Sequence, residues 1–215
     1  MSINIPKNTK NIKKIKIKKI NLDIVRQKGL FDEGCYESAC NDICCEYGCD
    51  VDLASLKLIY KHRKQIEPLI KAKIEDCFQS GLKADDDYIG GGWRETEVRE
   101  KDQRCMFHLH KESGCSLFYL VGKKGLPEQL IPTICKTYPI TWNRGDLFVD
   151  RPLRQICKCR EIIPKDRWIP SLYETQKKYL KRVFDIPAKE IEKVEKALKK
   201  EKALAAPRIK AVKEK

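Results

Sequence analysis

The stretch CYESACNDICCEYGC, residues 35–49, places five cysteines within fifteen residues, at Cys35, Cys40, Cys44, Cys45 and Cys49. A buried cysteine often serves as a small apolar side chain, but that role suits one thiol better than five neighbouring ones. If the stretch is helical, residues four apart share a face, so Cys40 lies beside Cys44 and Cys45 beside Cys49. A tight loop would instead wrap the same thiols around one point. Either conformation predicts that several thiols meet at one site.

A second, more dispersed set of cysteines follows between residues 105 and 159. Each member lies at the edge of a short apolar segment, which suits it to place a sulfur in a shared interior; the set is Cys105, Cys115, Cys135, Cys157 and Cys159. Cys77 differs, because it lies among apolar positions of an expected helix. We therefore expect Cys77 to be an ordinary buried thiol.

The eleven cysteines favour a metal over disulfides. Their number is odd, and the N-terminus lacks the continuous apolar region of a secretory signal. No run of eighteen apolar residues suggests a membrane span. We therefore expect a cytoplasmic protein, where the reducing environment keeps thiols free unless a metal binds them.

The positive charge of the chain is concentrated at its ends. The formal net charge is +14, of which residues 1–29 contribute +8 and residues 188–215 contribute +5. We therefore divide the chain into a basic N-terminal segment (1–29), a cysteine-cluster domain (30–160) and a helical basic C-terminal extension (161–215). Clustered lysines give sequence-independent affinity for phosphates, so a weak nucleic-acid contact through these ends is one hypothesis. Solubilising tails are the alternative.

The pattern of apolar residues predicts several elements. Asp52 stands at the N-cap position of a helix, and Pro68 should separate that helix from the next. Ser171 and Glu174 form the capping box S-x-x-E of another helix. A last helix should run from about residue 187 to residue 205, before Pro207. The stretch KIKIKKINL should be disordered or form a basic edge strand, and GDLFVD should form a short strand or hairpin arm. The predicted fold is mainly α with irregular metal-stapled loops and a few short strands.

Several of these motifs together resemble a known family. The run Cys-x4-Cys-x3-Cys-Cys, followed by CMF, GCSL and CKTYPI, is similar to the CxxCxxCC, or YkgJ-like, family of zinc- or iron-chelating cysteine-cluster proteins. Within it, the cysteine domain of flagellin lysine-N-methylases is most alike. The similarity covers roughly residues 30–159, and Ile140 replaces the family's arginine after Tyr-Pro. It implies a ligand set of Cys35, Cys40, Cys44, Cys45, Cys105, Cys115, Cys135 and one of Cys157 or Cys159, with Cys49 outside it.

The identity and task of the metal stay open at this point. Thiolates suit zinc and iron–sulfur clusters, including a 4Fe–4S cluster, and the spacing matches neither zinc ribbons nor ferredoxins. We expect a metal-binding protein with no established reaction. The alternatives are a cluster-dependent enzyme, methyltransferase-like or redox, acting on a protein substrate, and a metal-stabilised nucleic-acid or ribosome-binding protein. The run Gly90-Gly91-Gly92-Trp93 could approach a nucleotide, but a plain turn explains it more simply.

Overall fold

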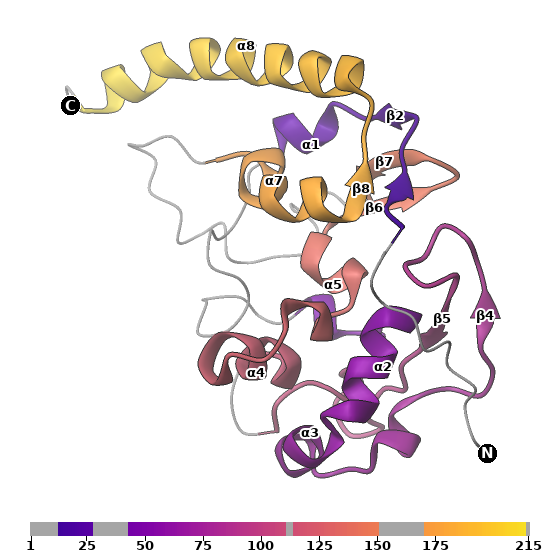
Figure 1. Cartoon of the computed structure of the whole chain (residues 1–215). Coiled ribbons are helices and arrows are strands. Elements are labelled where there is room, and N and C mark those ends of the chain that lie inside the picture. Colours follow the sequence, from indigo (N-terminus) through magenta and orange to yellow (C-terminus); the bar gives the residue numbers. More distant parts are fainter. Residues whose placement is uncertain (1–12, 28–42, 111–113, 151–169, 214–215) are drawn as a thin grey trace.

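The computed structural model describes residues 13–27, 43–110, 114–150 and 170–213, which form a mixed arrangement of helices and short strands (Figure 1). The helices are α1 (Asp23–Arg26), α2 (Leu53–Lys61), α3 (Arg63–Ile70), α4 (Ser116–Lys124), α5 (Thr133–Thr137), α7 (Leu172–Val183) and α8 (Ala188–Lys213), with 3-10 turns η1 (Ile43–Cys45), η2 (Ile74–Cys77) and η3 (Glu128–Leu130). The strands are β1 (Ile15–Lys16), β2 (Lys19–Ile20), β3 (Asp50–Asp52), β4 (Lys83–Ala84), β5 (Gly92–Glu95), β6 (Ile140–Asn143), β7 (Asp146–Val149) and β8 (Phe184–Asp185).

The strands pair into three small sheets. β1 lies parallel to β8, β2 lies parallel to β7 of the β6–β7 hairpin, and β5 lies between β3 and β4. The prediction of a mainly α fold with metal-stapled loops is therefore wrong. The fold is mixed α and β, and the described residues contain no group of three or more His, Cys, Asp or Glu placed to hold an ion. Strands of two to four residues are too short for an alternating pattern to reveal them.

The described parts of both basic ends, residues 13–27 and the first turns of α8, pack into one hydrophobic core. Ile15, Ile17 and Ile20 are buried, and they pack with residues of β6, β7, α7 and α8. The edge strand expected at KIKIKKINL is thus present as β1 and β2, with its isoleucines inside and its lysines outside. The β-hairpin arm expected at GDLFVD is confirmed as β7.

A second core lies around α2, α3 and α4 and contains Cys45, Cys77 and Cys105. In Figure 1, α5 lies between this part of the molecule and the part formed by α1, α7 and α8. Ile134 packs against the first core, whereas the next residue, Cys135, packs against the second. The short helix α5 therefore joins the two cores.

Both predicted helix caps are confirmed, but two predicted helix ends are wrong. Asp52 accepts a hydrogen bond from the Ser55 amide, and Ser171 with Glu174 forms the complete capping box of α7. The chain breaks at His62, between α2 and α3, while Pro68 lies inside α3. α8 also continues beyond Pro207. A proline removes only one backbone donor, so the hydrogen bonds on either side of it can persist. No helix in the described ranges has the length and apolar character to cross a membrane.

Candidate metal centre

Six cysteines from separate parts of the sequence surround one small cavity. The cavity measures about 20 Å³ and is lined by Cys44, Cys45, Cys49, Cys105, Cys115 and Cys135, together with Phe107, Leu117, Phe118 and Pro132. Five of these cysteines belong to the predicted ligand set, and Cys49 is the addition. The predicted ligands Cys35, Cys40, Cys157 and Cys159 lie outside the described residues.

Backbone hydrogen bonds hold the first cysteine segment against the Cys105 segment. The amide of Cys105 donates to the carbonyl of Cys45 at 2.6 Å. Thr96 adds two bonds to Cys49, because its hydroxyl accepts from the Cys49 amide at 2.8 Å and its own amide donates to the Cys49 carbonyl at 3.0 Å. The two segments are thus fixed to each other at the backbone level, independently of any metal.

Cys115 enters the cavity from the start of α4. It is the N-cap residue of that helix, and Ser116 donates its amide to the carbonyl of Phe107 at 2.8 Å. Phe107 itself lines the cavity and is 1% exposed. The chain reversal between Phe107 and Ser116 therefore returns Cys115 to the neighbourhood of Cys105.

Cys135 is positioned by the carboxylate of Asp52, which lies three residues after Cys49. One oxygen of Asp52 caps α2 through the Ser55 amide, and the other accepts from the amide of Thr133 at 2.9 Å. Asp52 and Thr133 are each 2% exposed. A single buried side chain therefore ties the first cysteine segment to the start of α5, two residues before Cys135.

The thiols contact one another inside the cavity. The Cys49 side chain interacts with those of Cys105 and Cys135, and the Cys105 S–H donates to the hydroxyl of Thr96 at 3.6 Å. The hydrogen bond with Cys49 and burial raise the pKa of Cys105 well above its usual value. The pKa of Cys45 is raised by its hydrogen bond with Cys44 and by burial. Crowded, buried sulfurs cannot all ionise, because each thiolate repels the next.

Backbone amides nevertheless point at two of the sulfurs. Burial raises the pKa of Cys115 to about 12, while the amides of Phe118 and Leu117 donate to its sulfur and oppose that rise. The amide of Phe107 acts in the same way on Cys105. Such donors stabilise a negative sulfur, and they are the kind of outer-shell contact that accompanies thiolate ligands. The arrangement favours thiolates once a cation is present to offset their repulsion.

The described residues do not bring three ligand side chains to chelating geometry. The six thiols line one cavity without meeting at a single point, so they would have to draw closer to share an ion. All seven described cysteines are free thiols, and none forms a disulfide with another. The donor set is therefore suited by its chemistry to a thiophilic metal.

The sequence predicts the position of Cys77 correctly but not that of Cys49. The family resemblance places Cys49 outside the ligand set. In the structure, however, Cys49 lies between Cys105 and Cys135. The sequence feature that could have indicated this role is its spacing of four residues from Cys45. Cys77 is fully buried, as expected, and donates to the carbonyl of Lys73 at 3.2 Å without lining the cavity. Burial raises the pKa of Cys77 to about 12.

The glycine run and the two histidines that follow Cys105 have contacts of their own outside the cysteine cavity. The glycine run is explained by the β4–β5 pairing, because a Cβ on Gly92 would meet the carbonyl oxygen of Lys83 at 2.5 Å. His110 lies against the carbonyl of Ile70 at 2.8 Å, and His108 is buried beside Arg99. Neither histidine lines the described wall of the cysteine cavity.

Comparison of the chain with protein-family models, with curated proteins and with solved structures found no match. The similarity to the cysteine-cluster family therefore stays a prediction.

Proposed function

We propose that this chain is a metal-binding protein that holds zinc or an iron–sulfur cluster in its multi-cysteine site. The observation that supports the proposal is the convergence of six thiols from separate segments on one cavity. The segments are joined there by the Cys105–Cys45 backbone bond and by the Asp52–Thr133 bond. Disulfide bonding does not explain the convergence, because these thiols are free.

The donor set fits a thiophilic cation. Without a cation, the raised pKa values keep Cys45, Cys49 and Cys105 protonated. A bound metal displaces those protons, so binding should release protons and add its free energy to that of folding. Cys44, Cys45, Cys49, Cys105, Cys115 and Cys135 would supply the sulfur ligands.

The size of the cavity favours a single ion over a cluster. A volume of about 20 Å³ suits one body the size of a water molecule. One zinc ion meets that limit once its thiolates draw inward, whereas a four-iron cluster with its sulfides fills more than that volume. We therefore place zinc first and a cluster second. A cytoplasmic location, which we also propose, would keep the thiols reduced for either one.

A cobalt titration of the reduced, metal-free full chain tests this function. Co²⁺ replaces zinc in tetrahedral thiolate sites and gives intense thiolate-to-metal absorption in the near ultraviolet. We expect saturable absorption with proton release, reversed by added zinc. Absence of thiolate-to-metal absorption at saturating cobalt, in a chain shown to be folded, would contradict the function.

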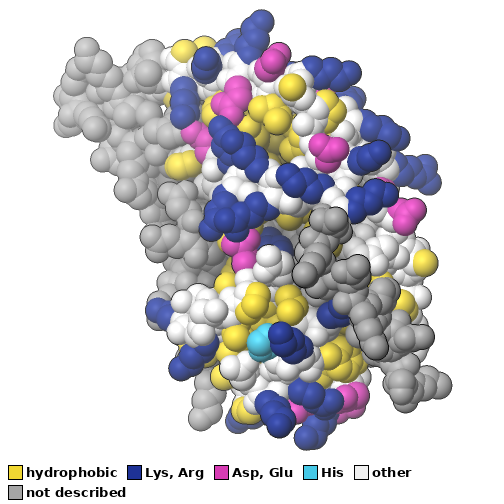
Figure 2. Space-filling model, viewed as in Figure 1, with side chains coloured by type: hydrophobic (Ala, Val, Ile, Leu, Met, Phe, Trp, Pro, Cys, Tyr) yellow, Lys and Arg dark blue, Asp and Glu magenta, His cyan; other side chains and the backbone are white. Residues whose placement is uncertain are grey.

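A second function is supported by a separate observation: the two basic ends form one region. The ammonium of Lys14 donates to the carbonyl of Lys181 at 2.7 Å, and Lys193 donates to the carbonyl of Ile20 at 3.0 Å. Figure 2 shows Lys and Arg side chains gathered over this end of the molecule, where α7 and α8 lie in Figure 1. We define the basic region as residues 13–26 and 172–202. Such a region suits weak, sequence-independent phosphate binding, as on RNA.

Substitution of lysines tests the RNA hypothesis better than truncation does, because Ile15, Ile17 and Ile20 belong to the core. We expect Lys196→Gln/Lys199→Gln/Lys200→Gln to weaken retention of single-stranded RNA. The salt slope should fall by about 0.7 for each phosphate that the variant no longer neutralises. An unchanged slope would contradict this second function and leave the metal site unaffected.

A further inference from the structure

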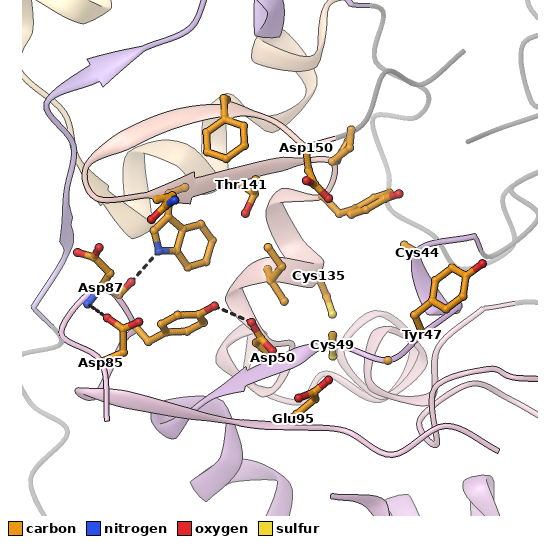
Figure 3. Close-up of a pocket in the computed structure, with 18 of the residues that line it drawn as sticks. Cys44, Tyr47, Cys49, Asp50, Asp85, Asp87, Glu95, Cys135, Thr141 and Asp150 are labelled. Carbon is orange, nitrogen blue, oxygen red and sulfur yellow. Dashed lines mark hydrogen bonds between the residues drawn. The ribbon is translucent and has the colours of Figure 1, made fainter. Parts of the chain in front are cut away.

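A large acidic and aromatic cleft opens beside the cysteine cavity and has no role in the functions proposed above. Its volume is about 910 Å³, within the range of small-molecule sites. Cys44, Cys49 and Cys135 line both spaces, so the cleft reaches the cysteine cavity from one side. Figure 3 shows Cys49 and Cys135 between Asp150 on one side and Glu95 on the other.

The charge of the cleft is opposite to that of the whole chain. Six carboxylates line it, namely Glu46, Asp50, Asp85, Asp87, Glu95 and Asp150, and the described lining includes no Lys or Arg. Glu95 has one ion pair, with Lys83 at 3.3 Å, and Asp50 accepts from the hydroxyl of Tyr88 at 2.6 Å. A chain of net charge +14 thus contains a negatively charged cleft. The local field of the cleft attracts a cation, although the net charge of the whole chain repels it.

Aromatic rings form much of the remaining wall. They are Tyr47, Tyr88, Tyr138, Trp142 and Phe148. Tyr88 and Trp142 are held in place, since their ring centroids lie 5.5 Å apart and the indole N–H of Trp142 donates to the Asp87 carbonyl at 2.7 Å. Ring faces attract organic cations and also cover their methylene groups.

The spacing of the carboxylates points away from an inorganic ion. In the described part of the chain, no three carboxylates of the cleft lie close enough together to share one ion. The carboxylates come instead from separate segments: before α2, in the loop that contains Asp85 and Asp87, on β5 and after β7. A ligand with several separated positive groups joined by apolar links matches this distribution.

We propose that the cleft binds a linear organic polyamine, with its ammonium groups at separate carboxylates and its methylene chain against the rings. The proposal goes beyond the metal-binding function and does not depend on it, because the carboxylates and rings are present without a metal.

Calorimetric titration of the full chain with spermidine tests the proposal, with metal content measured on the same samples. We expect one spermidine per chain, with affinity that weakens as salt rises. The neutral compound 1,8-octanediol, of similar length, should give no saturable binding. If protein that contains metal does not bind spermidine, the polyamine proposal is overturned. If the purified protein contains no metal but binds spermidine, the result supports the polyamine proposal and counts only against the proposed metal-binding function.

Two charge-matched variants separate the cleft from a general electrostatic effect. Glu95→Gln/Asp150→Asn removes two carboxylates that face each other across the cleft, and we expect the affinity for spermidine to fall at least tenfold. Glu192→Gln/Glu201→Gln changes the net charge equally on α8 and should leave the affinity within twofold. Equal losses in both variants would overturn the proposal. Binding of an oligolysine peptide without binding of free spermidine would overturn it as well.

Discussion

At the scale of single residues, the central finding is the difference between Cys49 and Cys77. Cys77 is fully buried and Cys49 is half-buried, but both thiols have raised pKa values, so the pKa alone does not separate them. Their neighbours do: Cys49 contacts two other thiols, whereas Cys77 contacts a backbone carbonyl. A ligand role belongs to the thiol with sulfur neighbours.

Serine substitutions at these two positions test that distinction. Cys49→Ser should remove at least half of the bound metal, because it replaces the sulfur between Cys105 and Cys135. Cys77→Ser should leave the metal content unchanged while lowering the free energy of unfolding by about 1 to 3 kcal/mol, since it buries a hydroxyl in an apolar core. Metal analysis and urea unfolding give the two readouts. Equal metal content in both variants would remove the basis for treating Cys49 as a ligand.

The sequence predicted five of the six thiols at the cavity but could not rank Cys49. A spacing of four suggests a shared face only if the segment is helical, and Cys49 in fact precedes a strand. Its position depends on Thr96, which is 47 residues away in the chain. Contacts of that range leave no local signal.

At the scale of elements, Asp52 connects α2 to α5, the helix that carries Cys135. Its carboxylate caps α2, and it also holds the buried amide of Thr133 at the start of α5. The same side chain thereby fixes the distance between the Cys49 and Cys135 segments. Removal of the Asp52 carboxylate should affect both folding and metal binding.

Asp52→Ala should lower the free energy of unfolding by about 2 to 4 kcal/mol, because a helix cap is removed and a buried amide is left without an acceptor. It should also reduce metal content. Ser171→Ala is the matched control, since it removes the cap of α7, no residue of which lines the cysteine cavity. The control should cost about 1 kcal/mol and keep the metal. A metal content that falls equally in both variants would assign the decrease to general destabilisation.

Caps were predictable from the sequence because they depend on residues three apart. The break at His62 and the continuation of α8 past Pro207 were not, because packing decides where such helices stop. The pairing of β1 with β8 joins Ile15 to Phe184, far apart in the chain, and strands of two residues carry no recognisable pattern.

At the scale of the whole molecule, carboxylates secure α8 to the rest of the fold. Glu190 accepts from the Ile20 amide and from Lys193, and Glu195 accepts from Lys177 and from the hydroxyl of Tyr173. The Ile20 amide holds the pKa of Glu190 below its usual range, and Lys177 does the same for Glu195. These contacts join the N-terminal strands, α7 and α8.

Acid should therefore weaken this end of the molecule. A lowered pKa in the folded state contributes stability that is present above the unfolded value, about 4.3, and is lost as the pH falls through the folded value. We expect the free energy of unfolding to decrease from about pH 5 towards pH 3, with lower amide-exchange protection factors in α8 after correction for the intrinsic exchange rate. Glu190→Gln/Glu195→Gln should flatten that decrease. If the free energy of unfolding falls with pH equally in the variant and the natural chain, the loss of stability in acid does not come from Glu190 and Glu195.

The most direct test of the central claim is metal and sulfide analysis of the full chain purified without oxygen. We predict at least one bound zinc for each chain or, as the second candidate, iron with acid-labile sulfide and a brown colour. Cys44, Cys45, Cys49, Cys105, Cys115 and Cys135 should then react slowly with a thiol reagent until a chelator is added. A folded chain that contains neither zinc nor iron, with reagent kinetics that a chelator does not change, would contradict the claim.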